Sequence, residues 1–339
     1  MRGKLLRAAL ALAALEAFNR WQESAAGPVR WPLPGPARYY LWDEGRIFYT
    51  VAGPSDAPAL LLVHGINAAA FSYEMRKQLA PPLTERYQVY ALDLLGFGQS
   101  DRPPLRYTPE LYIHLIGDFI RDVIAAPAHV VASSLSAAYA ISAKTRDQRA
   151  GRDLIERLVL ICPTGLQRLN QPPSAVGEAS HAVLRSPVVG QALFNLVASK
   201  PSLWYYLLQR TYYWARFVPP EMVARYYDSS HQLGARWAPA SFLGGGLNHD
   251  VAEDWSQIRS PTLIVWGRQA SFTPVEDASA FLAGNPAARL HVFERCGLLP
   301  HDEYAPEFNE MVAAFFAGDE ASDAASVGDG RSLESQESA

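Results

Sequence analysis

Residues 128–140, AHVVASSLSAAYA, join a buried strand to a helix through a single serine. The apolar run before Ser134 is typical of a strand that is covered on both faces, and the stretch after it favours a helix. Small residues, Ala132 and Ser136, stand two positions away on either side of the serine. A sharp strand–turn–helix elbow needs small residues at those positions because it brings neighbouring backbones close together. Ser134 is therefore the candidate nucleophile, held at the tip of a central strand.

Apolar runs on both sides of this segment predict the rest of a sheet. The segments ALLLVHG, QVYALDL, RLVLICP, TLIVWG and RLHVFER each have the length and composition of a buried strand. Residues 41–53 alternate in polarity and favour an antiparallel hairpin that joins the same sheet. Helical patterns separate the strands, and in one of them Thr108 is the predicted N-cap before Pro109. The sequence therefore predicts an α/β fold with a mostly parallel sheet.

The chain divides into a core, an inserted region and two ends. Between RLVLICP and TLIVWG no convincing strand occurs, and the sequence there is rich in aromatic residues, which predicts a helical cap. The low-hydrophobicity end of the chain is expected to be disordered. The predicted segments are an N-terminal helix at 1–21, a proline-rich connector at 22–38, the α/β core at 39–165 and 259–317, the cap at 166–258 and the disordered tail at 318–339.

The N-terminal helix combines three basic residues, Arg2, Lys4 and Arg7, with an apolar run over 8–15. This run is too short to span a bilayer. An amphipathic helix, packed on the domain or lying on a membrane surface as a peripheral contact, is one interpretation. A cleaved signal peptide and a disordered leader are the alternatives. The expected location is the cytoplasm, with membrane association and secretion left open.

Composition excludes several classes of partner and cofactor. The chain has 30 basic and 34 acidic residues, a net charge of −4, and no basic stripe, so we expect no nucleic-acid partner. Its two cysteines, Cys162 and Cys296, stand far apart and outside any metal-ligand spacing. Two buried free thiols are predicted, and no metal or cofactor is expected.

A second motif, LLLVHGIN, ends a strand about seventy residues before the elbow. The amide that follows this His-Gly pair can point at the site of a developing oxyanion. The backbone N–H groups of Ile66 and Leu135 are therefore the predicted oxyanion hole. His64 is interpreted as a structural residue beneath the site. Asp93 and the glycines of LDLLGFGQSDRP are interpreted as a loop-forming signature.

Five segments in order, HGINAAAFSYE, LDLLGFGQSDRP, SSLSAAY, PTLIVWGRQASFTP and CGLLPHDE, resemble the α/β-hydrolase superfamily over residues 45–316. The resemblance implies the α/β-hydrolase fold: a mostly parallel eight-stranded sheet with helices on both faces and a cap inserted after the sixth strand. It also implies a catalytic triad in the chain order serine, acid, histidine.

Two of the three triad positions depart from this pattern. The acid position after Trp266-Gly267 is Ala270, and the histidine position after Gly297 is Leu298. The other residues of both motifs match the family pattern. Because a serine hydroxyl without an adjacent base is a weak nucleophile, efficient conventional hydrolysis is not expected. His301 and His249 are the candidate replacement bases.

Two functions are consistent with these residues. The first is a serine hydrolase of the ester or acyl type, acting on a lipophilic small molecule through Ser134 with a non-standard base. The aromatic cap suggests the substrate class. The second is a catalytically silent member of the fold that binds an apolar ligand or a partner protein. Chemistry that needs only the oxyanion pocket, such as a lyase or isomerase reaction, is a third possibility that nothing in the sequence selects.

Overall fold

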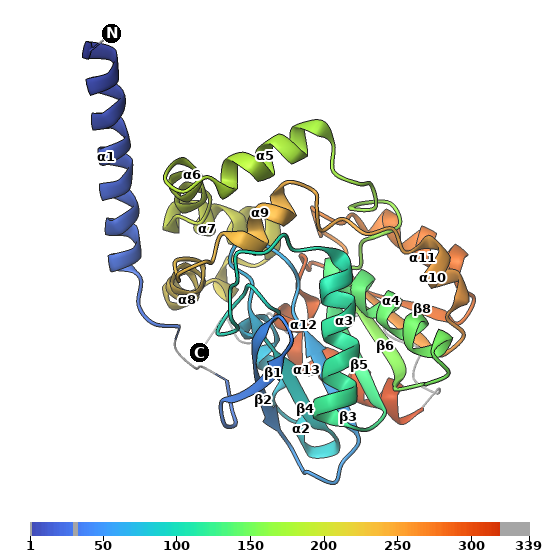
Figure 1. The fold of residues 1–339 in the computed structure, drawn as a ribbon. Coiled ribbons are helices and arrows are strands. Elements are labelled where there is room, and N and C mark those ends of the chain that lie inside the picture. Colours follow the sequence, from blue (N-terminus) through green and yellow to red (C-terminus); the bar gives the residue numbers. More distant parts are fainter. Residues whose placement is uncertain (1, 30–32, 319–339) are drawn as a thin grey trace.

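The computed structural model describes residues 2–29 and 33–318, and the tail predicted at 318–339 lies outside them from residue 319 onward. An eight-stranded sheet runs through the molecule in the order β1-β2-β4-β3-β5-β6-β7-β8 (Figure 1). The first two pairings, β1–β2 and β2–β4, are antiparallel and the other five are parallel, which confirms the predicted mostly parallel sheet and the N-terminal hairpin. The strands are β1 (Arg38–Trp42), β2 (Gly45–Ala52), β3 (Ala59–Val63), β4 (Gln88–Leu92), β5 (Ala128–Ser133), β6 (Ile155–Ile161), β7 (Thr262–Gly267) and β8 (Ala288–Phe293).

Helices cover both faces of the sheet, so the central strands are buried on both sides (Figure 1). Thr108 caps the helix α3 as predicted, its hydroxyl accepting a hydrogen bond from the Leu111 N–H at 3.3 Å. The core helices are the 3₁₀ helix η1 (Ser72–Gln78), α2 (Leu83–Arg86), α3 (Pro109–Phe119) with its π-helical end η2 (Ile120–Ile124), α4 (Leu135–Arg149), α10 (Ala252–Gln257), the 3₁₀ helix η5 (Val275–Asp277), α11 (Ala278–Gly284), α12 (Pro300–Glu303) and α13 (Ala305–Ala317).

The inserted cap follows β6 and covers the carboxyl ends of the strands (Figure 1). Its helices are α5 (Ala175–Arg185), α6 (Val189–Val197), α7 (Lys200–Tyr206) with its π-helical end η3 (Leu207–Thr211), the 3₁₀ helix η4 (Ala215–Phe217), α8 (Pro220–Ser230) and α9 (Trp237–Leu243). The cap ends earlier than the predicted residue 258, because α10 packs on α4 and α11 of the core. The buried Trp255 indole of α10 donates to the Phe281 carbonyl of α11 at 2.8 Å.

The N-terminal helix α1 (Arg2–Ala25) continues past the predicted end at residue 21. Its C-terminal half packs on α6, and its N-terminal half projects from the body of the molecule (Figure 1). Among the helices that the structure describes, none is long and apolar enough to cross a membrane.

Candidate functional site

Ser134 occupies the turn between β5 and α4 in a strained backbone conformation, with φ 53° and ψ −121°. Its amide continues the sheet by donating to the Ile161 carbonyl at 2.8 Å. The Ser136 hydroxyl donates to the His64 carbonyl at 2.7 Å and ties the start of α4 to the end of β3. Because such strain persists only where the surroundings enforce it, this geometry is that of the predicted nucleophile elbow.

Two backbone amides near Ser134 are free to stabilise an oxyanion. Ile66 follows the end of β3, and Leu135 is the first residue of α4. Neither N–H group donates a hydrogen bond to any residue in the described part of the chain. A helix N-terminus adds a partial positive charge at the same place. The two amides predicted as the oxyanion hole therefore remain available for that role.

His64 has a structural role, as its position beneath the elbow suggested. Its Nε2 accepts a hydrogen bond from the Leu94 N–H at 3.1 Å, so its Nδ1 carries the proton and donates to the Gly65 carbonyl at 2.7 Å. Burial lowers the pKa of this histidine, which keeps the ring neutral. The Asp93 carboxylate likewise accepts hydrogen bonds from two backbone N–H groups, that of Ser72 at the start of η1 and that of Gln99, each at 2.7 Å.

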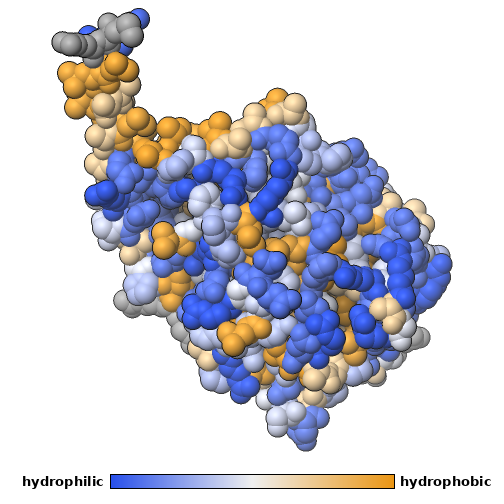
Figure 2. Space-filling model, viewed as in Figure 1, coloured by the Kyte–Doolittle hydropathy of each residue, from blue (hydrophilic) through white to orange (hydrophobic). Residues whose placement is uncertain are grey.

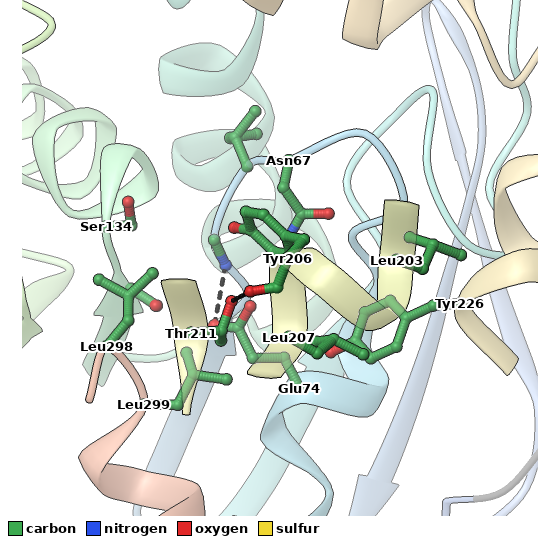
Figure 3. Close-up of a pocket in the computed structure, with 13 residues that line it drawn as sticks. Asn67, Glu74, Ser134, Leu203, Tyr206, Leu207, Thr211, Tyr226, Leu298 and Leu299 are labelled. Carbon is green, nitrogen blue, oxygen red and sulfur yellow. Dashed lines mark hydrogen bonds between the residues drawn. The ribbon is translucent and has the colours of Figure 1, made fainter. Parts of the chain in front are cut away.

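The two substituted triad positions lie on adjoining loops that follow β7 and β8. The Gln269 N–H donates to the Cys296 carbonyl, and the Gln269 side chain accepts from the Cys296 N–H, both at 2.9 Å. Ala270 is buried in the first loop. Leu298 is buried in the second and lines the same pocket as Ser134, with its side chain next to the serine in Figure 3. An apolar side chain thus lies beside Ser134 at the position where the sequence resemblance predicts the base.

The close contact between these loops depends on glycine. A Cβ added to Gly267 would lie 1.9 Å from the Gly297 carbonyl oxygen. We expect Gly267→Ala to lower the free energy of unfolding by about 1–3 kcal/mol, because the second loop must move away. Urea denaturation measures this change. Gly117→Ala is the matched control, since nothing lies within 4 Å of its added Cβ in α3, and it should stabilise the protein by up to about 1 kcal/mol. Equal midpoints for the two variants would contradict the packing argument.

The structure does not bring His249 to Ser134. Its Nε2 lies 2.8 Å from the Ser142 hydroxyl, on the middle of α4, and that hydroxyl also bonds Asp254. Burial lowers the pKa of His249. His249 lines neither of the two cavities that Ser134 lines. This histidine therefore belongs to the contact between α4 and the segment that follows the cap.

His301 is also separated from the nucleophile. The ring is completely buried, and neither of its nitrogens has a hydrogen-bond partner among the described residues. Its Nε2 lies 3.7 Å from the Glu74 Oε1, and burial lowers the pKa of the ring to about 4. Like His249, His301 does not line the cavities that contain Ser134. His301 contacts Glu74 rather than Ser134, so a direct proton transfer from Ser134 to either histidine has no support in this geometry.

Glu74 is a polar residue of the site that the sequence analysis missed. It sits on η1, and only 4% of its surface is exposed. Its Oε1 accepts the Gly65 N–H at 3.1 Å, and the Ser133 hydroxyl bonds the same carboxyl group. A Cβ on Gly65 would stand 3.4 Å from both the Glu74 Oε2 and the Ser134 Cβ. The carboxyl group and the nucleophile are therefore both close neighbours of Gly65.

Burial raises the pKa of Glu74 to about 7, because the charged form loses its hydration. The hydrogen bonds from Ser133 and Gly65 oppose this shift without cancelling it. A carboxyl group that titrates near neutral pH beside a candidate nucleophile is typical of a general acid or base. The one available signal in the sequence was an acidic residue between apolar neighbours, in FSYEM, and it is not specific.

Two cavities have Ser134 in their linings. The smaller holds about 30 Å³, enough for a water molecule, and Glu74 lies across it from Leu298 and Ser134 (Figure 3). The larger holds about 500 Å³ between core and cap and is mainly apolar. Ser134, Ile66, Asn67, Leu203, Tyr206 and Leu298 line both cavities.

The cysteines are free and buried, as predicted. Burial raises the pKa of Cys162 to about 12, so this thiol at the end of β6 is not a competing nucleophile. Within the described ranges, no three His, Cys, Asp or Glu side chains converge to hold a metal ion.

A serine elbow on the central strand of a mostly parallel sheet, beneath a helical cap, defines an α/β-hydrolase architecture. Comparison with known proteins agrees. A model described as the alpha/beta hydrolase family matches residues 60–311, and the chain belongs to this family.

Several relatives and solved structures resemble the chain over most of its length. The 2-hydroxy-6-oxononadienedioate/2-hydroxy-6-oxononatrienedioate hydrolase of Cupriavidus pinatubonensis is 27% identical over 295 residues, which span 83% of this chain and 95% of that protein. A serine hydrolase involved in carbazole degradation matches with a TM-score of 0.68 and 22% identity, over 84% of this chain and 99% of its own. A membrane phospholipase A matches with a TM-score of 0.63 and 22% identity, over 94% of this chain and 99% of its own. Both solved structures have the same fold as this chain.

Proposed function

We propose that this protein is a serine-dependent hydrolase of lipophilic acyl compounds, with Ser134 as nucleophile and Glu74 as the proton acceptor. One observation carries the proposal: Ser134 and the Glu74 carboxyl group line a single water-sized chamber at the base of an apolar cavity. The two unbonded amides beside the elbow supply the stabilisation that an acyl-transfer intermediate needs.

The proton would travel by way of one water molecule in the chamber. The Ser134 hydroxyl oxygen attacks the acyl carbonyl carbon, and its proton passes through the water to the Glu74 carboxylate. The protonated carboxyl then returns a proton to the leaving oxygen, and a second water hydrolyses the acyl-serine ester by the same route. The pKa of about 7 suits both directions of transfer near neutral pH.

The cavity lining favours an uncharged substrate. Among the described lining residues of the larger cavity, Arg168 is the one charged residue, and its guanidinium already bonds the Asp277 carboxylate at 2.6 Å. The relative from Cupriavidus pinatubonensis is named for dioate substrates, which carry two carboxylates. A dianion would find no unpaired cation in this cavity. A lipophilic ester or a related acyl compound fits the lining better.

Covalent labelling tests the proposal directly. We expect a fluorophosphonate probe to modify the wild-type protein at Ser134, and p-nitrophenyl esters to be hydrolysed above the background of Ser134→Ala. Labelled-peptide mass spectrometry and initial rates measure the two effects. Ser279→Ala is the matched control, because Ser279 is exposed on α11, and it should label and turn over as the wild type does. Failure of both labelling and turnover in the folded protein would contradict the proposal.

A catalytically silent protein that binds an apolar ligand in the larger cavity is the second candidate. The observation in its favour is Leu298, which places an apolar side chain against Ser134 at the position of the family's base. Saturable binding of a lipophilic fluorescent probe, together with no turnover in any pH range, is the result that favours this function.

A further inference from the structure

The N-terminal half of α1 is exposed on every side. From Gly3 to Ala14 the structure contains no half-buried residue, although most of these residues are apolar. The side chains of Leu5, Leu6 and Leu10 are each more than 60% exposed. A contiguous exposed apolar surface of this kind marks a site that interacts with another apolar surface.

The C-terminal half of the same helix is fixed to the cap by buried polar contacts. The Asn19 amide donates to the Val188 carbonyl at 3.0 Å and accepts from Asn195 of α6 at 3.1 Å. The Tyr227 hydroxyl of α8 donates to the Gln22 side chain at 2.9 Å. These contacts hold the helix in one direction, so its exposed half is presented at a defined place beside the cap.

The cap continues this apolar surface. On α6, residues at the spacing i, i+4, i+7 and i+8 point outward, although the opposite side of the helix is already buried in the cap. Figure 2 shows apolar surface on the projecting part of α1 and along the adjoining edge of the molecule. We call this surface the apolar face; it comprises residues 3–14 of α1, Val176 and Val183 of α5, and Val189, Leu193, Leu196 and Val197 of α6.

We propose that the apolar face docks the protein on the surface of a lipid bilayer that contains anionic lipids. A protein partner would have to enclose the projecting helix on all sides, whereas lipid surrounds an inserted helix without a shaped groove. Lys4 and Arg7 are exposed on the same segment, in a chain whose net charge is −4, and can bind lipid phosphates. The segment extends about 18 Å at 1.5 Å per residue, less than the hydrocarbon core of about 30 Å, so the contact is peripheral.

The apolar face and the larger cavity share a residue. Val197 belongs to the apolar face, is 39% exposed, and lines the cavity that contains Ser134. Leu243, at the end of α9, is another exposed residue of that lining. If the proposed hydrolase function holds, a lipophilic substrate dissolved in the bilayer could enter the cavity without crossing water. The docking itself does not depend on the chemistry of Ser134.

Flotation with vesicles tests the docking on the full-length protein. We expect the wild type to float with vesicles of phosphatidylcholine and phosphatidylglycerol, and less with phosphatidylcholine alone. Leu5→Gln/Leu10→Gln should lower the partition coefficient about tenfold or more. Lys4→Gln/Arg7→Gln should remove most of the dependence on phosphatidylglycerol. Leu41→Gln/Leu282→Gln is the matched control, because these exposed leucines lie on β1 and α11, outside the apolar face, and it should float as the wild type does.

Three results would overturn the proposal. The wild type could remain at the bottom of the gradient, or the matched control could lose as much binding as Leu5→Gln/Leu10→Gln. The third result is a wild type that does not float and that light scattering shows to be a dimer, which Leu5→Gln/Leu10→Gln dissociates. That result would assign the apolar face to a second copy of the chain. Because flotation requires no turnover, a Ser134→Ala variant should float normally, and failure of the hydrolase proposal would be recognised separately.

Discussion

Ala270→Asp combined with Leu298→His is expected to raise the hydrolysis of p-nitrophenyl esters by about 10²-fold or more over the wild type. Removing members of a model serine-protease triad costs about 10⁴ to 10⁶ in rate, so a rebuilt triad that recovers part of this factor gives a gain of that order. Steady-state kinetics on purified, folded protein measure the effect.

The positions of the two loops support this expectation. Leu298 lines the pocket of Ser134, so an imidazole of similar size in its place would face the hydroxyl group. Ala270 follows Gln269, which forms two hydrogen bonds with Cys296. Cys296 stands two residues before Leu298, so the two loops are held together next to both positions. An aspartate there would therefore be close to the new histidine and could orient it.

The controls separate chemistry from repacking. Ser134→Ala added to the double variant should abolish the gain, and Leu298→His alone should give a smaller one because its ring lacks an orienting acid. Thermal unfolding checks that an aspartate at the buried position 270 is tolerated. A folded double variant with no gain would mean that the elbow or its amides no longer stabilise an acyl intermediate.

Glu74→Gln is expected to reduce kcat/KM of the wild-type activity by about 10²- to 10⁴-fold, the range that general acid–base catalysis contributes. The amide oxygen of glutamine can still accept the Gly65 N–H, so the fold around the elbow should be kept. The loss should appear in kcat, with KM little changed, because Glu74 acts on a proton rather than on substrate binding.

The pH profile gives a readout that a purely structural role would not change. The base must be ionised, and the pKa of Glu74 is raised to about 7, so kcat/KM should rise with pH through about 7 and then level off. In Glu74→Gln this rise should disappear. Glu276→Gln, an exposed residue on η5, is the control that should keep it. An unchanged profile in Glu74→Gln would remove this residue from the proton route.

The fold was predictable because it depends on patterns that are local in the chain. Apolar runs of strand length, separated by helical segments, indicated the mostly parallel sheet, and Thr108 marked a helix start that the structure confirms. The boundary between the cap and the core was less predictable. The predicted cap extended to residue 258, but α10 joins the core because its Trp255 is buried against α11, a contact between segments that are separate in the sequence.

By itself, the sequence determined the family, and it predicted the elbow at Ser134 and the replacement of the usual acid and histidine by Ala270 and Leu298, because each rests on residue identity within a short motif. Only the tertiary structure decided which polar groups surround the serine. It placed His249 against Ser142 of α4 and His301 against Glu74, and it brought Glu74 to the pocket of Ser134 instead. The physical reason is that the direction and burial of a side chain follow from the packing of distant segments, which no local pattern encodes.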